Sequence, residues 1–197
     1  ITHMPDVANT PIKVCSRASL LIGGDAIQSF EDGTAEATVS SAMYEDMARS
    51  ALTNSRWRFA TDQAVLNRLT EAPTGRWDAA YQLPADYIML SAITVNEQNI
   101  KYDLYGTKAF CNATATDTVI ADFVFRADES TWPPYFLTAV QYMMAGVLAV
   151  SVARDSQLAS LMEQKANFQM VQARRLHSQQ QTTRKLDTSR FIAERRS

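Results

Sequence analysis

Hydrophobic residues recur at helical spacing near the start of the chain. Residues 12–22 predict a short helix that ends at Gly23-Gly24, since glycine is typical of a helix C-terminus. A second helix is expected after Thr34, a favourable N-cap, with Glu36 in its first turn. Its predicted core face has the i, i+4 spacing of an amphipathic helix. The residues on that face are Val39, Met43, Met47 and Ala51, with Tyr44, Ala48 and Leu52 beside them.

The middle of the chain changes to alternating apolar and polar residues, which is typical of strands. One hairpin is predicted in residues 93–104, around the polar turn 96–99. A second pair of strands is predicted in residues 105–125, separated by the turn-forming stretch 112–117. Together they indicate a small antiparallel sheet inserted between two helical halves. In the last strand the residues expected on one face are Val119, Ala121, Phe123 and Phe125, opposite Asp122 and Arg126.

The helical pattern returns after Pro133-Pro134, which fit the opening of a helix. Within this helix Ala145 and Ala149 recur at i+4 beside Gly146, so another helix is expected to approach closely there. The sequence Arg154-Asp155-Ser156 predicts a break and the N-cap of a last helix, which ends near His177. The apolar residues expected to pack that helix are Leu158, Leu161, Met162, Phe168 and Val171.

These patterns predict an α+β protein. It is mainly an α-helical bundle with an inserted small antiparallel β-sheet and an extended C-terminal tail. The predicted segments are an extended N-terminal arm (1–11), N-terminal helices of the bundle (12–56), a β-rich insertion (57–130), C-terminal helices of the bundle (131–177) and an extended basic tail (178–197).

Composition is that of a soluble globular protein, with 46% hydrophobic and 20% charged residues. One segment tests that interpretation, because no charge lies between Glu129 and Arg154 and residues 135–153 are long enough to cross a bilayer. It carries Thr138 and Gln141 and is the only run of its kind. The sequence therefore favours a buried helix in a bundle or subunit contact, with no membrane partner.

Charge is distributed unevenly although the net charge is only −2. Residues 174–197 hold seven Lys and Arg against two Asp and Glu, so this segment carries +5 and the rest of the chain −7. Such asymmetry indicates a charged partner for the tail, and its low apolar content predicts disorder in isolation. The tail residues expected to contact a partner are Arg184, Lys185, Arg190, Arg195 and Arg196, with the apolar pair Phe191-Ile192 as an anchor.

Known catalytic motifs are missing from the sequence: it contains no GxGxxG, P-loop, GxSxG, HExxH or CxxC. The only histidines, His3 and His177, lie toward the two ends, and His177 is expected to be a solvated or capping residue. No histidine base or zinc ligand set is therefore predicted, and neither is a cofactor. The two cysteines, Cys15 and Cys111, indicate buried free thiols in a reducing compartment.

Two other functions stay open at this point. The loop carboxylates Asp25, Glu31 and Asp32 suggest a cell-wall hydrolase, which needs two carboxylates placed across a bond. Neighbouring carboxylates usually form a solvated turn, so the chain is predicted not to be an enzyme. The basic tail suggests a DNA-binding packaging factor, because its cations could contact phosphates. No aromatic stacking platform accompanies them, so a protein partner is favoured.

Three stretches together resemble a known family. The first runs from CSRASLLIGGDAIQSF to SRWRFATDQAVL, and the second is WDAAYQLPADYIML, with the step Leu83-Pro84-Ala85-Asp86. The third is IKYDLYGTKAFCN followed by VIADFVFRADESTWPPYF, with Tyr102, Gly106, Trp132 and Phe136. Their order and spacing over residues 15–176 resemble the head-to-tail adaptor (connector) proteins of tailed bacteriophages, a group that includes tail tubular protein A of short-tailed phages.

The resemblance implies a structural homo-oligomer in the virion, commonly a ring of twelve copies, assembled in the cytoplasm of the bacterial host. The ring would join the portal protein to the tail nozzle or tail tube. DNA would pass through it without sequence-specific binding, and no cofactor or catalysis is implied. Trp57, Phe59, Trp132 and Phe136 are expected in the core, the first two at the helix-to-sheet junction. The tail is then the expected portal or neighbour-subunit interface, and deletion after His177 is predicted to leave a folded monomer that does not join the portal.

Overall fold

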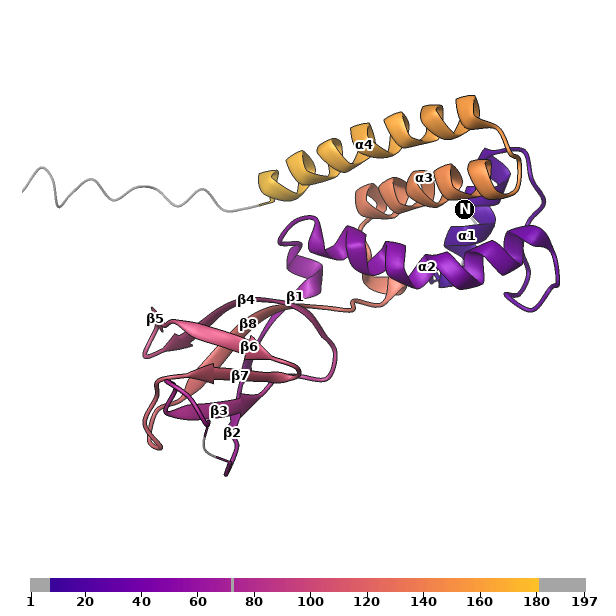
Figure 1. Cartoon of the computed structure of the whole chain (residues 1–197). Helices are drawn as coiled ribbons and strands as arrows, with labels where there is room; N and C mark the ends of the chain where they lie inside the picture. The colour runs from indigo at the N-terminus through magenta and orange to yellow at the C-terminus, as the bar shows by residue number, and fades with distance from the viewer. Residues whose placement is uncertain (1–7, 72, 181–197) are drawn as a thin grey trace, which may run out of the picture.

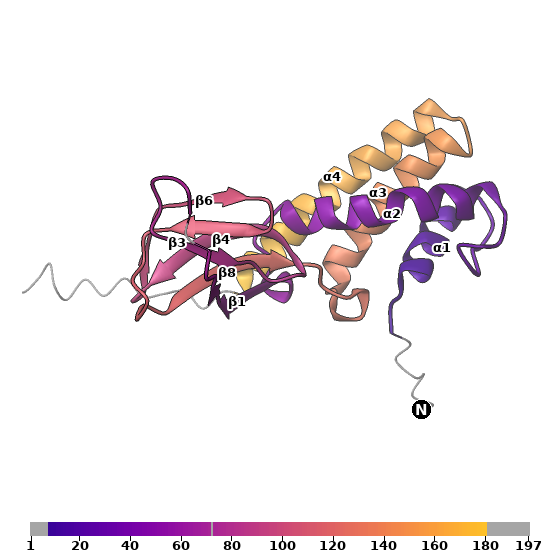
Figure 2. The same ribbon diagram turned by 60° about the horizontal axis from the view of Figure 1, so that its bottom comes forward.

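The computed structural model describes residues 8–71 and 73–180, and within them the fold is α+β, with four α-helices and two small antiparallel sheets. The helices gather at one end of the molecule and the strands at the other, in both views (Figures 1 and 2). The strands lie between α2 and α3 in the sequence, so the chain leaves the helical region, builds the sheets and returns. The α+β prediction is confirmed.

The helices begin where the sequence supplies caps. Thr34 Oγ1 accepts a hydrogen bond from the Ala37 backbone N–H (3.2 Å). The Asp155 carboxylate accepts from the N–H groups of Gln157 and Leu158, each at 2.9 Å. Both predicted N-caps are confirmed. The helices are α1 (Pro11–Leu21), α2 (Ala35–Thr53), α3 (Pro134–Ser151) and α4 (Ser156–Gln179), with short 3-10 turns at η1 (Arg58–Ala60) and η2 (Glu129–Thr131).

The strands form two four-stranded sheets, where the sequence pattern predicted one. The first has the order β1 (Thr61–Val65), β8 (Val119–Phe125), β4 (Tyr87–Val95) and β5 (Gln98–Asn99). The second has the order β2 (Asn67–Arg68), β3 (Ala79–Gln82), β7 (Lys108–Cys111) and β6 (Tyr102–Tyr105).

The predicted strand pairs are only partly right. Asn96 and Glu97 both have positive φ, which suits a two-residue hairpin, but the strand that follows them in the first sheet is only two residues long. The chain then passes to the second sheet at β6. β7 pairs with β3 and β6, whereas β8 pairs with β1 and β4, so the predicted pairing of 105–111 with 119–125 is wrong. Alternation shows which side chains share a face but does not select the partner strand.

Two clusters of buried side chains form the core. The sheets enclose the smaller one, which includes Tyr81, Ile93 and Phe123. Val124, the next residue on β8, belongs instead to the helical cluster, so β8 contributes to both. The largest fully buried side chains of the helical cluster are Trp57, Phe136, Leu52, Met144, Leu148, Val14, Val124 and Val140.

Two predicted helix faces need correction. On α2 the side chain of Met43 is 45% exposed, whereas Tyr44, Ala48 and Leu52 are buried. On α4 the predicted core residues Leu161, Phe168 and Val171 are 45%, 60% and 42% exposed. Small side chains let α4 lie close to α3, and its larger apolar residues are left outside. The inward residues of α4 are Ala159, Met162, Ala166, Met170, Ala173 and His177.

Candidate functional site

The helical region and the sheets meet at an aromatic cluster centred on Phe136. Its ring lies 5.1 Å from that of Trp57, 5.0 Å from Phe59 and 5.0 Å from Trp132, between ring centroids. Trp57 Nε1 donates to the Ala51 carbonyl at 3.1 Å. Trp57, Trp132 and Phe136 are buried and Phe59 is half-buried. The structure thus brings the four aromatic residues named from the sequence together where α2, η1 and α3 approach β1.

His177 completes this cluster from the end of α4, and the expectation of a solvated histidine is wrong. Its side chain is 6% exposed and its ring packs edge-on against Trp57, 5.3 Å between centroids. Nε2 lies 3.2 Å from the Arg56 carbonyl and 3.3 Å from the Arg58 N–H, so it either donates to the first or accepts from the second. Burial lowers the pKa of His177, and the nearby Arg58 charge lowers it further. The hydrogen bond with the Arg56 carbonyl raises the pKa but does not outweigh these two effects. The imidazole is therefore neutral at pH 7.

The junction also fixes the point where the C-terminal segment leaves the helical region. The Arg58 guanidinium donates to the Gln180 carbonyl at 2.8 Å, which ties the residue after α4 to the start of the sheets. The interface residues predicted from the sequence lie outside the described residues. They are Arg184, Lys185, Arg190, Phe191, Ile192, Arg195 and Arg196.

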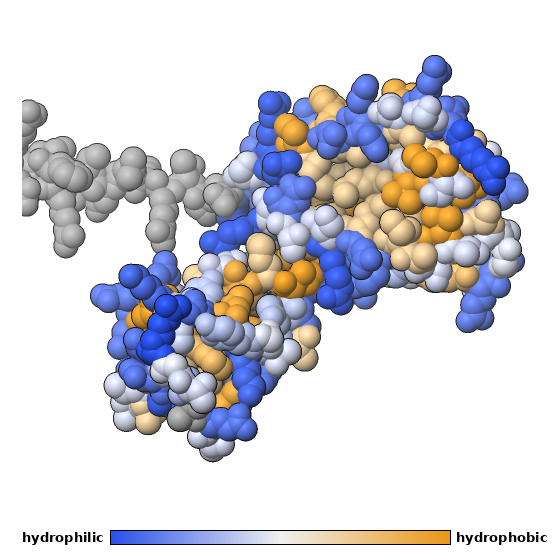
Figure 3. Space-filling view, in the orientation of Figure 1, coloured by the Kyte–Doolittle hydropathy of each residue, from blue (hydrophilic) through white to orange (hydrophobic). Residues whose placement is uncertain are grey.

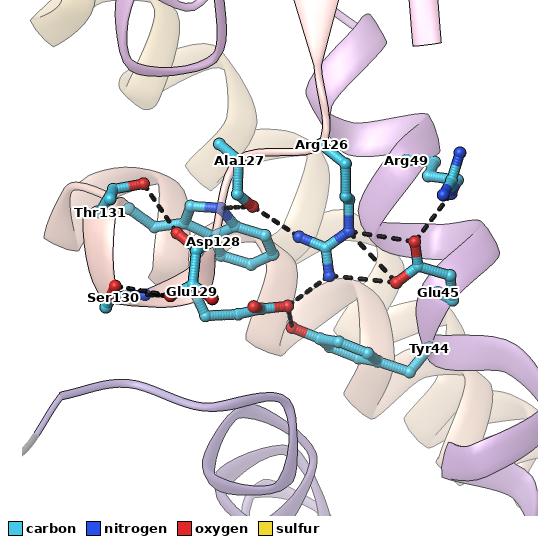
Figure 4. Close-up of polar contacts among 10 residues, drawn as sticks. Tyr44, Glu45, Arg49, Arg126, Ala127, Asp128, Glu129, Ser130 and Thr131 are labelled. Atoms are coloured by element: carbon cyan, nitrogen blue, oxygen red, sulfur yellow. Dashed lines mark hydrogen bonds and ion pairs between the residues drawn. The ribbon is translucent and has the colours of Figure 1, made fainter. Parts of the chain in front are cut away.

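A charged network lies between α2 and the segment that leads from β8 into α3 (Figure 4). Arg126 forms ion pairs with Glu129 and, at 3.1 Å, with Glu45. Glu129 is 3% exposed and also accepts a hydrogen bond from the Tyr44 hydroxyl at 2.9 Å. Arg49 binds the opposite edge of Glu45 at 2.7 Å. The network braces α2 against the β8–α3 segment.

The network is electrostatically complementary rather than reactive. Burial and the adjacent Glu129 carboxylate raise the pKa of Tyr44 far above neutral pH. Desolvation works against the charge on Arg126, but hydrogen bonds from its guanidinium to Glu45 and Glu129 outweigh it and raise its pKa. Partial burial likewise opposes ionisation of Glu45, yet the hydrogen bonds from Arg126 and Arg49 lower its pKa. Arg126 and Glu45 therefore stay charged and Tyr44 stays neutral through the physiological range, as a structural brace requires.

The small residues of α3 lie in the interior, as a close helix contact requires. Ala145, Gly146 and Ala149 are all buried. A Cβ built on Gly146 would be 3.5 Å from Glu163 Cγ and 3.8 Å from Met162 Cβ, both on α4. α3 is also long and apolar enough to cross a membrane by length and composition, and half of that window is buried inside the protein. The core helix of a soluble protein has the same properties.

An apolar hollow runs along the exposed side of α3 between α2 and α4, where Figure 3 shows apolar residues gathered. It consists of two adjoining depressions of about 280 and 310 Å³ that share Met143, Val147 and Glu163. We call this surface the α3 groove. Its remaining lining residues are Met47, Gly146, Val150, Ser151, Ala166 and Asn167.

A second hollow lies on the sheet region beside Trp77 and has a volume of about 550 Å³. Its polar groups bind one another: the Asp103 carboxylate accepts from the Trp77 indole N–H at 3.0 Å and pairs with Arg76. The Arg76 side chain is 75% exposed. The pair anchors a surface loop, and its functional groups are already engaged.

The loop carboxylates are not arranged across a cleft. Asp32 accepts the backbone N–H groups of Gln28 (2.8 Å) and Ser29 (2.9 Å), so it stabilises its own turn. Asp25 and Glu31 are exposed. Among residues 8–71 and 73–180, no group of three or more His, Cys, Asp and Glu side chains could hold a metal ion.

The two cysteines are free and buried. Burial raises the pKa of Cys15 to about 12 and that of Cys111 to about 11. Both thiols are therefore protonated near neutral pH, and neither has the lowered pKa of a reactive nucleophile.

No protein-family model and no curated protein matches the sequence. Function is therefore inferred from the described chain itself.

Proposed function

We propose that the chain is a structural head-to-tail adaptor of a tailed bacteriophage. In this proposal the helices form a bundle whose copies associate into a ring, commonly of twelve subunits. The ring joins the portal protein to the tail nozzle or tail tube within the virion. The extended C-terminal tail reaches the portal or a neighbouring subunit.

The observation that carries the proposal is the convergence of the segments on which the family resemblance rests. Residues of SRWRFATDQAVL form β1, which pairs with β8 from VIADFVFRADESTWPPYF; Ala64 lies opposite Ala121. WDAAYQLPADYIML supplies β4 on the other side of β8, where Leu90 lies opposite Phe123. Segments far apart in sequence thus form one sheet beside the aromatic cluster. This supports the interpretation of the three stretches as parts of one structural unit, because the sheet needs a strand from each of them.

The step Leu83-Pro84-Ala85-Asp86 has a structural role that agrees with this interpretation. It connects β3 of the second sheet to β4 of the first. Leu83 is buried, Tyr87 N–H donates to the Pro84 carbonyl at 3.4 Å, and Arg126 N–H donates to the Asp86 carbonyl at 3.2 Å. The step therefore fixes both the crossing between sheets and the start of the charged network.

Charge supports a channel function. The chain before residue 174 carries −7 and the remainder +5. An acidic body would let DNA pass without binding tightly, because like charges repel, and a basic tail would bind acidic surface on a partner. The tail starts from the end of α4, which Arg58 holds at the helix–sheet junction.

The proposal is tested by electron microscopy of the protein mixed with the purified portal ring of the same phage. The full chain is expected to add a ring of density to the portal. A variant that carries Glu at Arg184, Lys185, Arg190, Arg195 and Arg196 keeps the full length and is expected to lose that density. A matched variant that carries Glu at five exposed basic residues elsewhere in the chain, Arg17, Arg56, Arg76, Lys101 and Arg154, controls for net charge. A full chain that never joins the portal would refute the proposal.

A further inference from the structure

α4 carries apolar residues on two opposite sides. Met162, Ala166 and Met170 recur at four-residue intervals on the buried side. On the other side Leu161, Phe168 and Val171 are spaced by seven and three residues, about two turns and one turn, and all are exposed. Leu176, 44% exposed, lies about two turns beyond Phe168. We call these four residues the α4 outer stripe.

The outer stripe is not explained by the fold of one chain. The buried side of α4 already covers α3, and a helix that is apolar on both sides is usually packed on both sides. Phe168 is 60% exposed, which leaves most of a large aromatic side chain in water. Exposed apolar rows of this kind mark interaction surfaces.

The α3 groove is a surface of the opposite shape on the same chain. The outer stripe is a ridge of four large side chains, whereas the groove is a hollow between three helices. Its lining includes Met47, Met143 and Val147, and methionine adapts readily to an inserted side chain. Figure 3 shows apolar residues exposed on the face between α4 and α2.

The charges beside the two surfaces are opposite. Two exposed charged residues beside the outer stripe on α4 are Lys165 and Arg175, both basic. The Lys165 ammonium also lies over the Tyr142 ring of α3, 5.8 Å from its centroid. The groove has Glu163 in its lining, and Asp46 precedes Met47 on the exposed side of α2. None of these four forms an ion pair among residues 8–71 and 73–180. The acidic α3 groove and the basic outer stripe of α4 therefore attract one another.

We propose that the outer stripe of α4 packs into the α3 groove of a second copy of this chain. The two surfaces differ, so the contact is head-to-tail and each copy keeps one free ridge and one free groove for further copies. Repetition of one such contact closes a ring when its rotation allows closure. The inference rests on the ring of the proposed function and names the surfaces that build it.

Chemical cross-linking tests the contact. A Val147→Cys/Phe168→Cys chain is treated with a short flexible bismaleimide, which joins thiols without requiring disulfide geometry. The native Cys15 and Cys111 do not interfere, because both are buried. The double variant is expected to give a ladder that extends beyond the dimer, since each copy presents one thiol in the ridge and one in the groove. A Val147→Cys/Ala115→Cys chain, with its second thiol on an exposed sheet loop, is the matched control and is expected to stay monomeric.

Three results would overturn the proposal. A double variant that gives only monomer contradicts any contact between these surfaces, and one that stops at the dimer indicates a symmetric contact. If a Val147→Cys/Phe191→Cys chain cross-links within one chain while the Val147→Cys/Phe168→Cys chain gives no ladder, the chain's own C-terminal segment occupies the groove.

A second pair of variants separates this inference from the proposed function. Phe168→Asp alone and Val147→Asp alone are each expected to remain monomeric, while their mixture is expected to form a dimer through the one intact ridge and the one intact groove. If the mixture forms this dimer but the wild-type chain does not bind the portal, the proposed contact stands and the adaptor function is rejected. If the wild-type chain binds the portal but the mixture forms no dimer, the adaptor function stands and the proposed contact is rejected.

Discussion

The helical and sheet regions differ in how completely each buries its apolar residues. The sheets enclose a small core between them, and their large exposed apolar side chains are few and scattered: Val65, Met89, Leu104 and Tyr105. The helices bury a larger cluster and still expose twice as many large apolar residues. These are Leu20, Leu21, Met43, Val150, Leu161, Phe168, Val171 and Leu176.

This difference separates the residues that hold the fold from those available for assembly. Stability of the helical region comes from the Phe136 cluster and the Arg126 network, both of which lie where the two regions join. The residues of the α4 outer stripe and the α3 groove belong to neither feature and lie on the helices alone, although Leu176 directly precedes His177 of the aromatic cluster. Substitutions at the junction should therefore act on stability, and those on the ridge and groove on association.

Phe136→Ala is expected to have the largest effect on stability. Phe136 is fully buried and its ring contacts three aromatic neighbours, so the change leaves a cavity that rigid rings cannot fill. We expect a loss of about 3 to 5 kcal/mol in the free energy of unfolding, measured by urea denaturation. Tyr105→Ala is the matched control, since that ring is 55% exposed and contacts one aromatic ring. Equal losses in the two variants would contradict the comparison.

Arg126→Met is expected to cost about 3 kcal/mol, because it leaves the buried Glu129 carboxylate without its cation. Adding Glu129→Gln removes that charge while its amide oxygen still accepts from Tyr44, so the double variant should recover much of the loss. Arg49→Met is the control: it removes only an exposed pair with Glu45, which is worth about 0.5 kcal/mol or less. Urea denaturation of the wild type, Arg126→Met, Glu129→Gln and the double variant measures the coupling, and Arg49→Met is measured beside them. A double variant no more stable than Arg126→Met would argue against an unpaired buried charge.

The helix ends could be predicted from the sequence because their causes are local. Thr34 and Asp155 cap the residues two or three positions ahead, and Pro133-Pro134 opens α3. The α+β class could be predicted because the spacing of apolar residues changes from helical to alternating in the middle of the chain. Each of these features depends on neighbours within one helical turn, which a single sequence displays.

The strand partners and the face of α4 could not be predicted because their causes are non-local. β8 pairs with β1 and β4, whose residues lie more than twenty positions away. On α4 the large residues Leu161 and Phe168 suggested the core face, but the side that packs on α3 is the one that carries Met162, Ala166 and Met170. The signal that was missed is the four-residue recurrence from Met162 through Ala166 and Met170, continued by Ala173 and His177.

Acidification should loosen the junction through His177. Burial keeps its folded-state pKa below the ordinary value of 6.5, so the unfolded chain binds the proton first as pH falls. Stability is therefore undiminished above pH 6.5 and decreases below it, toward the lower pKa of the folded state. A His177→Gln chain should show a shallower fall in unfolding free energy between pH 7 and about pH 5.5. If unfolding free energy falls equally steeply with pH in the wild type and in His177→Gln, His177 is not the cause. Hydrogen exchange at low pH should locate the loosening at the end of α4.

Gly146→Ala should have the smallest effect and the opposite sign. Glycine inside a helix costs about 0.5 to 1 kcal/mol relative to alanine, because more backbone freedom is lost on folding. The added methyl group would meet Glu163 and Met162 at 3.5 and 3.8 Å, ordinary contact distances, so α4 does not need to move. We therefore expect a gain of up to about 1 kcal/mol by urea denaturation. Gly146→Leu is the paired variant, since its longer side chain must displace α4. If both variants are destabilised equally, α4 lies closer to α3 than ordinary contact allows.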